Sequence, residues 1–301
     1  MSAKTAASSV RLSESLKALI AAPHALGSAI PAPPRPAFQG LFNKISSTAE
    51  KNGAKNDVWL TLSTGALVTV NSPASLCELY DFASEKRGKD LKEQIRIAAI
   101  MREVGLKCIG KPWSSRTINA LGALRAHLSE DVKAGLSTES LRQPTEHNVN
   151  AAQIKARSLW DGIYEPHASK LLAKLAQSHP DLPVHILSSH YGPLFSDPVD
   201  TFPEGHYKIG RVLTSVVAIA CLRAQQGVGP QLTSHVFGLK KALLEGGGAD
   251  GEAVVEGQEW LTSDEGVKWA LDSVDGIAEV VVGRGKSSFA GAPGDEVKAK
   301  L

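Results

Sequence analysis

The sequence predicts an all-α protein, and three observations support this prediction. Apolar residues recur at the three- and four-residue spacing of helices through most of the chain, with polar residues between them. Prolines and glycines divide the chain into helix-sized segments. The 301 residues are 43% hydrophobic and 21% charged, which is ordinary for a globular protein with a buried core.

The first third contains the segment whose secondary structure is hardest to predict. A helix is expected over 12–22, an extended linker over 31–36 (PAPPRP) and a helix over 38–51. The next stretch, 59–73, is rich in β-branched residues and could suggest a strand. Its length before Asn71 and its Ser-Pro stop favour a buried helix. Another helix should then begin at Ser72, with Ser72 as its cap and Pro73 in its first turn.

Two amphipathic helices are predicted next, over 90–110 and 115–128, separated by Gly110-Lys111-Pro112. The polar stretch 136–150 reads as a connection between two halves. The second half should hold a helix over 151–177 that Pro166 bends or splits, a short helix over 184–191 and an ordered loop over 192–205. Further helices are expected over 206–225, 230–245 and 263–282, with Gly246-Gly247-Gly248 ending the second of these and disorder beyond Gly283.

These elements suggest five parts: an N-terminal extension over 1–56, a first helical unit over 57–135, a linker over 136–156, a second unit over 157–248, and a C-terminal helix and tail over 249–301. The first 36 residues are rich in Ala, Ser and Pro and carry four basic residues against one acid. This composition fits a mitochondrial transit peptide, and the alternative is a short helix followed by a loop. We expect an intracellular protein, cytoplasmic or mitochondrial, because three unclustered cysteines suit a reducing compartment.

Two segments of the chain match one another without a gap. Residues 96–128 align with residues 211–243 at an offset of 115 (211 − 96 and 243 − 128). Each consists of an apolar helix, a turn with glycine and proline, and a second helix that ends in Leu and a basic residue. Two helical hairpins of this kind can pack face to face, each burying the stripe that the other exposes.

The second of these segments resembles the carboxymuconolactone decarboxylase and alkylhydroperoxidase D superfamily. The resemblance is carried by an arginine, an Ala-rich helix, a glycine turn and a Gln-Leu-x-x-His-x-x-Gly string: Arg211, Ala218, Ala220, Gly227, Gln231, Leu232, His235 and Gly238. The first segment is similar in degenerate form, through Gly110, Pro112, Asn119, Ala120 and Leu121. The motifs cover about 70 residues directly. The resemblance is to a eukaryotic branch, with fungal proteins as the first candidates, and it implies a helical bundle and a symmetric homo-oligomer.

The sequence departs from the superfamily where its redox chemistry should lie. The peroxidase branch uses Cys-x-x-Cys-x-x-x-His, whereas the corresponding turn reads Lys111-Pro112-Trp113-Ser114 here. Cys108 lies nearby without a second cysteine in helical reach. It is a candidate peroxidatic or regulatory thiol if Lys107 and Lys111 lower its pKa, and otherwise a small buried side chain.

Four further residues are candidates for chemistry or binding. His235, at the edge of an apolar stripe, could transfer protons near neutral pH, and its alternative role is a packed histidine. Arg211 could bind a substrate carboxylate or form an inter-helix salt bridge, and Gln231 is a second candidate for substrate binding. Glu103 is a candidate acid or base in the first segment, or a surface residue.

Several function classes find no support in the sequence. The net charge is +2 without a basic cluster, so no nucleic-acid partner is expected, and no apolar run is long enough to span a membrane. No metal-ligand spacing, phosphate loop or cofactor motif occurs, so we expect neither metal nor cofactor.

Three hypotheses remain. The first is an enzyme acting on a small carboxylated or peroxidic molecule between the hairpins, through His235, Arg211 and Glu103. The second is a catalytically inactive helical protein that serves oligomerisation or partner binding. The third is a one-cysteine thiol peroxidase at Cys108.

Overall fold

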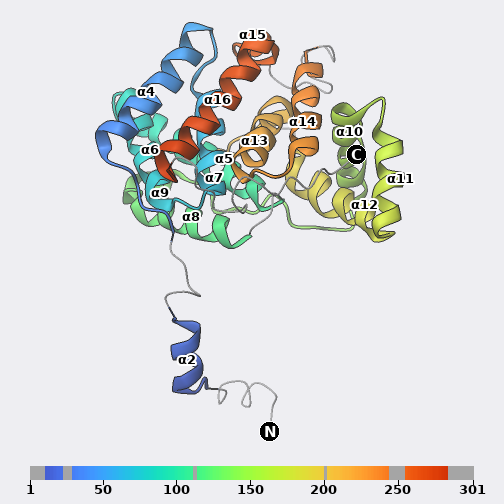
Figure 1. Cartoon of the computed structure of the whole chain (residues 1–301), viewed down its shortest axis with the longest axis horizontal. Coiled ribbons are helices and arrows are strands. Elements are labelled where there is room, and N and C mark those ends of the chain that lie inside the picture. The colour runs from blue at the N-terminus through green and yellow to red at the C-terminus, as the bar shows by residue number, and fades with distance from the viewer. Residues whose placement is uncertain (1–10, 23–28, 111–113, 200–201, 244–254, 284–301) are drawn as a thin grey trace.

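The computed structural model describes residues 11–22, 29–110, 114–199, 202–243 and 255–283, and over these residues it contains 14 α-helices and no β-strand (Figure 1). The all-α prediction is therefore confirmed for the described part of the chain. In chain order the helices are α2 (Glu14–Ile20), α4 (Arg35–Lys51), α5 (Asn56–Thr69), α6 (Pro73–Lys86), α7 (Leu91–Lys107), the 3-10 helix η1 (Cys108–Gly110), α8 (Ser114–His127), α9 (Glu130–Gly135), α10 (Val149–Tyr164), α11 (Ala168–Ser178), α12 (Asp181–His185), the π-helix η2 (Ile186–Phe195), α13 (Gly210–Gln225), α14 (Gly229–Lys241), α15 (Gln258–Thr262) and α16 (Asp264–Val281).

Helix α5 lies at the centre of the molecule. It packs against α4, α6, α7, α13 and α16, and Trp59, Leu60, Leu62 and Leu67 are fully buried. A helix surrounded on all sides needs apolar residues on every face, which explains why its sequence lacks a clear amphipathic pattern. Gly65 permits a close approach to α13, because a Cβ there would lie 3.1 Å from the Ala220 Cβ. The helical prediction for 59–73 is thus confirmed.

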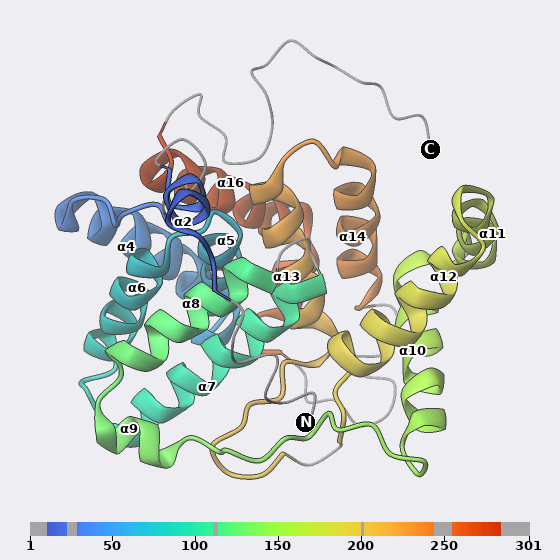
Figure 2. The ribbon, with the colours of Figure 1, turned by 90° about the horizontal axis from the view of Figure 1, so that it is seen from below.

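Two hydrophobic clusters organise the fold. The larger joins buried residues of α4 to α9 with those of α13 and α16. The smaller is built from α10, α11 and η2 around Trp160, Ile163 and Tyr191. Helices α10, α11 and α12 gather at one end of the molecule next to α14 (Figure 2). This end is where the candidate site lies.

The two matching segments form two pairs of contacting helices, α7 with α8 and α13 with α14. At the offset of 115, Ser114 aligns with Gly229 (114 + 115 = 229), and these are the first residues of α8 and α14. The shared architecture of two helical hairpins is therefore present, while the five-part division of the chain stays a prediction.

Several local predictions need correction. Ser72 is the N-cap residue of α6 but makes no side-chain cap: its hydroxyl donates to the Ile30 carbonyl at 2.7 Å. The loop predicted from residue 192 is helical to Phe195, with Pro193 inside the π-helix. The helix predicted from 206 begins at Gly210, the helix predicted from 38 begins at Arg35, and the short α9 and α15 were not predicted.

Other predictions were accurate or concern residues outside the description. Pro166 does separate α10 from α11, and the Ser263 hydroxyl caps α16 by accepting from the Gly266 N–H at 3.2 Å. The Gly246–Gly248 stop, the tail beyond Gly283 and the turn at 111–113 lie outside the described residues. No helix in the described ranges combines the length and apolar character that crossing a bilayer requires.

Candidate functional site

His235 is the centre of a buried polar cluster at the second hairpin. Helix α14 places its side chain against α10, where the His235 Nε2 lies 3.4 Å from the Tyr164 hydroxyl. The same hydroxyl lies 2.9 Å from the hydroxyl of Tyr191 on η2. Burial raises the pKa of Tyr164, and burial followed by the neighbouring Tyr164 raises the pKa of Tyr191 well above its ordinary value. Both phenols are therefore neutral hydrogen-bonding groups at physiological pH.

A small cavity lies beside this cluster. Its volume is about 10 Å³, and its polar lining comes from Lys107, Tyr191, Thr214 and His235. Five elements contribute to it: α7, α10, η2, α13 and α14. A space of this size holds about one water molecule, since a water needs roughly 10–15 Å³ by the same measure. The cavity is thus too small for an organic substrate.

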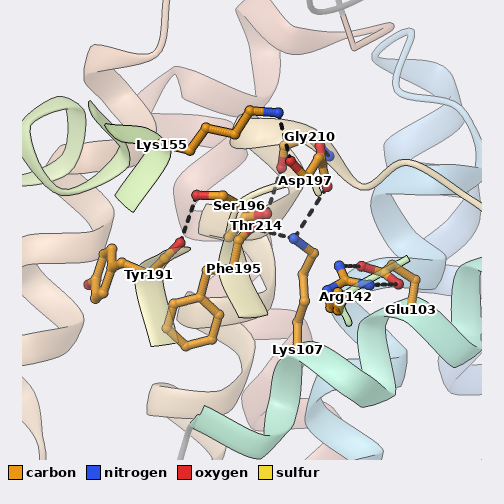
Figure 3. A network of polar contacts seen from close by, with 10 residues as sticks. All are labelled: Glu103, Lys107, Arg142, Lys155, Tyr191, Phe195, Ser196, Asp197, Gly210 and Thr214. Carbon is orange, nitrogen blue, oxygen red and sulfur yellow. Dashed lines mark hydrogen bonds and ion pairs between the residues drawn. The ribbon is translucent and has the colours of Figure 1, made fainter. Parts of the chain in front are cut away.

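Lys107 belongs to this site, although the sequence alone did not single it out as a site residue. Its side chain is fully buried, and its Nζ donates to the Phe195 carbonyl and lies 3.5 Å from Asp197 Oδ1 (Figure 3). Burial lowers the pKa of Lys107, while Asp197 and Glu103 oppose that effect. The signal was present in the sequence: Lys107 follows Ile100 by seven residues and Val104 by three, so a charge occupies the buried stripe of α7.

Asp197 connects Lys107 to two further elements. Its Oδ2 accepts from the Gly210 N–H at 3.0 Å, at the start of α13, and its backbone carbonyl accepts from Lys155 Nζ at 3.1 Å (Figure 3). A carboxylate at a helix N-terminus is favoured by the helix dipole. The Lys107–Asp197 pair therefore joins α7, α10 and α13 around the end of η2.

Glu103 lies one turn before Lys107 and is buried, so the surface alternative is wrong. Both carboxylate oxygens accept from Arg142, Oε2 from Nη1 at 3.2 Å and Oε1 from Nη2 (Figure 3). Arg142 belongs to the stretch predicted as a linker. This bidentate pair fixes that stretch on α7 and leaves Glu103 facing a guanidinium.

Cys108 has a neighbour that the sequence did not reveal. Its Sγ lies 3.5 Å from the Sγ of Cys221 on α13, and both thiols are buried. The contact with Cys221, followed by burial, raises the pKa of Cys108 well above its ordinary value. The lowering by Lys107 that the thiol alternative requires is not found, because the Lys107 ammonium is directed to Phe195 and Asp197. Lys111 lies outside the described residues.

Arg211 and Gln231 do not line the His235 cavity. Arg211 Nη2 donates to the carbonyls of Gly162 at 2.9 Å and Gly238 at 3.0 Å, and its Nη1 donates to Ser215. It thus ties α13 to α10 and α14 through carbonyls rather than through the predicted carboxylate. Gln231 is exposed in the first turn of α14. The five predicted site residues consequently lie at several separate places.

Three motif residues of the second segment share one structural task. Arg211 binds the Gly238 carbonyl, and a Cβ at Gly238 would lie 3.0 Å from Ile163 Cγ2. His235 contacts Tyr164 on the same helix as Ile163, α10. All three motif residues therefore serve the contact of α10 with α13 and α14.

A larger open pocket of about 580 Å³ lies at the N-terminal ends of α5 and α13. Arg96 Nη2 donates to both carboxylate oxygens of Asp57 there, at 2.7 and 2.6 Å, and the Arg96 guanidinium lies 5.3 Å from the ring centre of Tyr207. Among the described residues, no group of His, Cys, Asp and Glu side chains is arranged to hold a metal ion.

The chain matches no protein-family model, no curated protein and no solved structure. The resemblance to the superfamily consequently depends on the motif residues alone.

Proposed function

We propose that this chain is a catalytically inactive helical binding protein of the carboxymuconolactone decarboxylase-like type. One observation carries the proposal: the polar side chains around His235 contact neighbouring helices, and the cavity beside them measures only about 10 Å³. Pockets that bind organic ligands measure roughly 300–1,000 Å³. A carboxylated substrate has no room beside His235.

The arrangement of the charged groups also favours binding over turnover. Glu103 is neutralised by Arg142, and Arg211 is held by backbone carbonyls of two other helices. A substrate carboxylate would have to displace these partners, and leaving buried groups unpaired costs about 1–3 kcal/mol for each hydrogen bond. The thiol route is disfavoured as well, because the raised pKa of Cys108 leaves little of the reactive thiolate.

The proposal is tested by assaying the purified protein for hydrogen peroxide consumption and for carbon dioxide release from carboxymuconolactone. We expect rates equal to those without protein, and a His235→Ala variant that differs from the parent only in stability. His147→Ala is the control, because the His147 side chain is 88% exposed. Turnover by the parent that is lost in His235→Ala and retained in His147→Ala would overturn the proposal.

A second candidate function, acid–base catalysis, is favoured by one specific observation. Lys107 with its lowered pKa, Tyr191 and His235 meet around the same cavity, and groups with opposed pKa shifts are typical of acid–base sites. This function requires the cavity to open around a substrate. In the same assays it predicts that Lys107→Met removes turnover that the parent protein shows.

We propose in addition that the N-terminal segment is a targeting segment and the protein mitochondrial, with the cytoplasm as the alternative. Helix α2 lies away from the body of the protein (Figure 1). The apolar side chains on it and just before it are exposed: Leu12, Leu16, Leu19 and Ile20. An apolar face next to Arg11 and Lys17 suits an import signal. Residues 1–36 fused to a fluorescent protein should direct it to mitochondria, and a diffuse cytoplasmic signal would refute the proposal.

A further inference from the structure

A third cavity, the α10–α14 groove, lies on the outer side of the His235 cluster. It has a volume of about 550 Å³ and lies between the end of α10, the start of α11 and α14. Its apolar surface comes from Ile163, Tyr164, Pro166, Leu171 and Phe237. Phe237 is 61% exposed, although it is a large apolar side chain. An exposed phenylalanine in a groove of ligand size indicates a binding surface.

The charges at this groove are mostly positive. Lys170, Lys174 and Lys241 line it, against the single acid Glu165. Lys241 Nζ is fixed at the groove by the carbonyls of Ile163 and Glu165, each at 2.7 Å. Lys170 and Lys174 lie one turn apart on α11 and are both exposed. Two neighbouring ammonium groups beside an apolar surface are complementary to an amphiphilic anion.

We propose that the α10–α14 groove binds a medium-chain carboxylate, with the chain on Pro166, Leu171 and Phe237 and the carboxylate at Lys170 and Lys174. The inference rests on the proposed binding function and names its ligand class. Burial of each methylene raises affinity about fourfold, so an apolar chain supplies most of the affinity. The lysines provide orientation and the preference for an anion.

The groove is coupled to the inner cluster through Tyr164. The Tyr164 side chain lines the groove, while its hydroxyl contacts Tyr191 and His235, which line the inner cavity. Ile163 lines both spaces. A ligand in the groove therefore lies against the wall of the His235 cavity, and its binding should alter the environment of the His235 ring.

The test is isothermal titration calorimetry of the full chain with sodium dodecanoate below its micelle concentration. We expect one site, and a loss of affinity of about tenfold or more in the double variant Lys170→Glu/Lys174→Glu. Phe237→Ser should weaken binding as well, and dodecanol should bind more weakly than dodecanoate. The matched control is Lys44→Glu/Lys51→Glu, which makes the same change of charge at exposed positions of α4.

Three outcomes overturn the inference: no binding to the parent protein, an equal loss in the groove variant and the control variant, or equal affinities for dodecanoate and dodecanol. A concentration-dependent dimer that Phe237→Ser dissociates, without dodecanoate binding, would also overturn it and would assign the groove to a second copy of the chain. Each result is independent of the turnover assays, so the inference and the proposed function can fail separately.

Discussion

Replacement of Lys107 by methionine tests the structural role of the polar cluster. Methionine fills a similar space without the charge, and it leaves the nearly buried Asp197 carboxylate without its cation. The Phe195 carbonyl also loses its donor. Removing one partner of a buried ion pair costs about 3–5 kcal/mol, so we expect Lys107→Met to lower the free energy of unfolding by about this amount.

Substitution of Asp197, the ion-pair partner of Lys107, makes this prediction specific. In Lys107→Met/Asp197→Asn no buried charge is left uncompensated, and the carbonyl oxygen of the introduced asparagine can still accept from the Gly210 N–H. The double variant should therefore be more stable than the sum of the two single effects by about 1–3 kcal/mol. Urea-induced unfolding of the four proteins in the double-mutant cycle measures this coupling directly.

The difference in unfolding free energy between the parent and Lys107→Met should depend on pH, because the pKa of Lys107 is lowered. Between that pKa and the ordinary 10.5, the unfolded chain holds a proton on Lys107 that the folded protein has released. The stability contribution of Lys107 therefore rises with pH through this interval. The difference in unfolding free energy between the parent and Lys107→Met should increase in the same direction. Additive single effects would rule out the ion-pair role of Lys107, whereas a difference that falls with pH would contradict the lowered pKa of Lys107.

Three further predictions concern neighbouring parts of the fold. Cys108 and Cys221 should react with a thiol reagent only as fast as the protein unfolds, because both are buried. Cys77 should react slowly at pH 8, because burial and Asp81 raise its pKa to about 11. Rapid modification of two or more thiols in the native protein would contradict this prediction. Gly238→Ala should cost about 1–3 kcal/mol of stability, because the Cβ of the introduced alanine would lie 3.0 Å from Ile163 Cγ2. An unchanged urea midpoint would show that the helices can separate without cost. Arg211→Met should cost about 2–3 kcal/mol through the loss of two inter-helix hydrogen bonds, whereas a substrate-binding role would leave stability unaffected.

The helices were predictable where one periodic pattern decides their position. Helix α5 shows why length and a Ser-Pro stop matter more than β-branched content: its surroundings are apolar on every side, so β-branched residues fit there without a sheet. The part of η2 after Tyr191 was not predictable in the same way. Gly192 and Pro193 read as a loop, yet Pro193 removes only one backbone donor, and the aromatic contact of Tyr191 with Phe195 holds the turn in place.

The site was harder to predict because its partners are distant in sequence. Cys108 and Cys221 are separated by 113 residues, and Lys107 and Asp197 by 90. No local spacing relates residues so far apart. His235 could be found from its motif, but the motif does not show that the Tyr164 hydroxyl lies between His235 and Tyr191. Lys107 was the residue that helical spacing could have identified.

Histidine modification by diethyl pyrocarbonate distinguishes a closed, structural centre around His235 from an open one. Peptide mass spectrometry would follow the buried His235 and the exposed His147 in the native protein. We expect His147 to be modified rapidly and His235 only at the rate of unfolding. Modification of His235 at a rate close to that of His147 would show that the site is open to solvent, and the polar centre could then not be the closed helix contact described above.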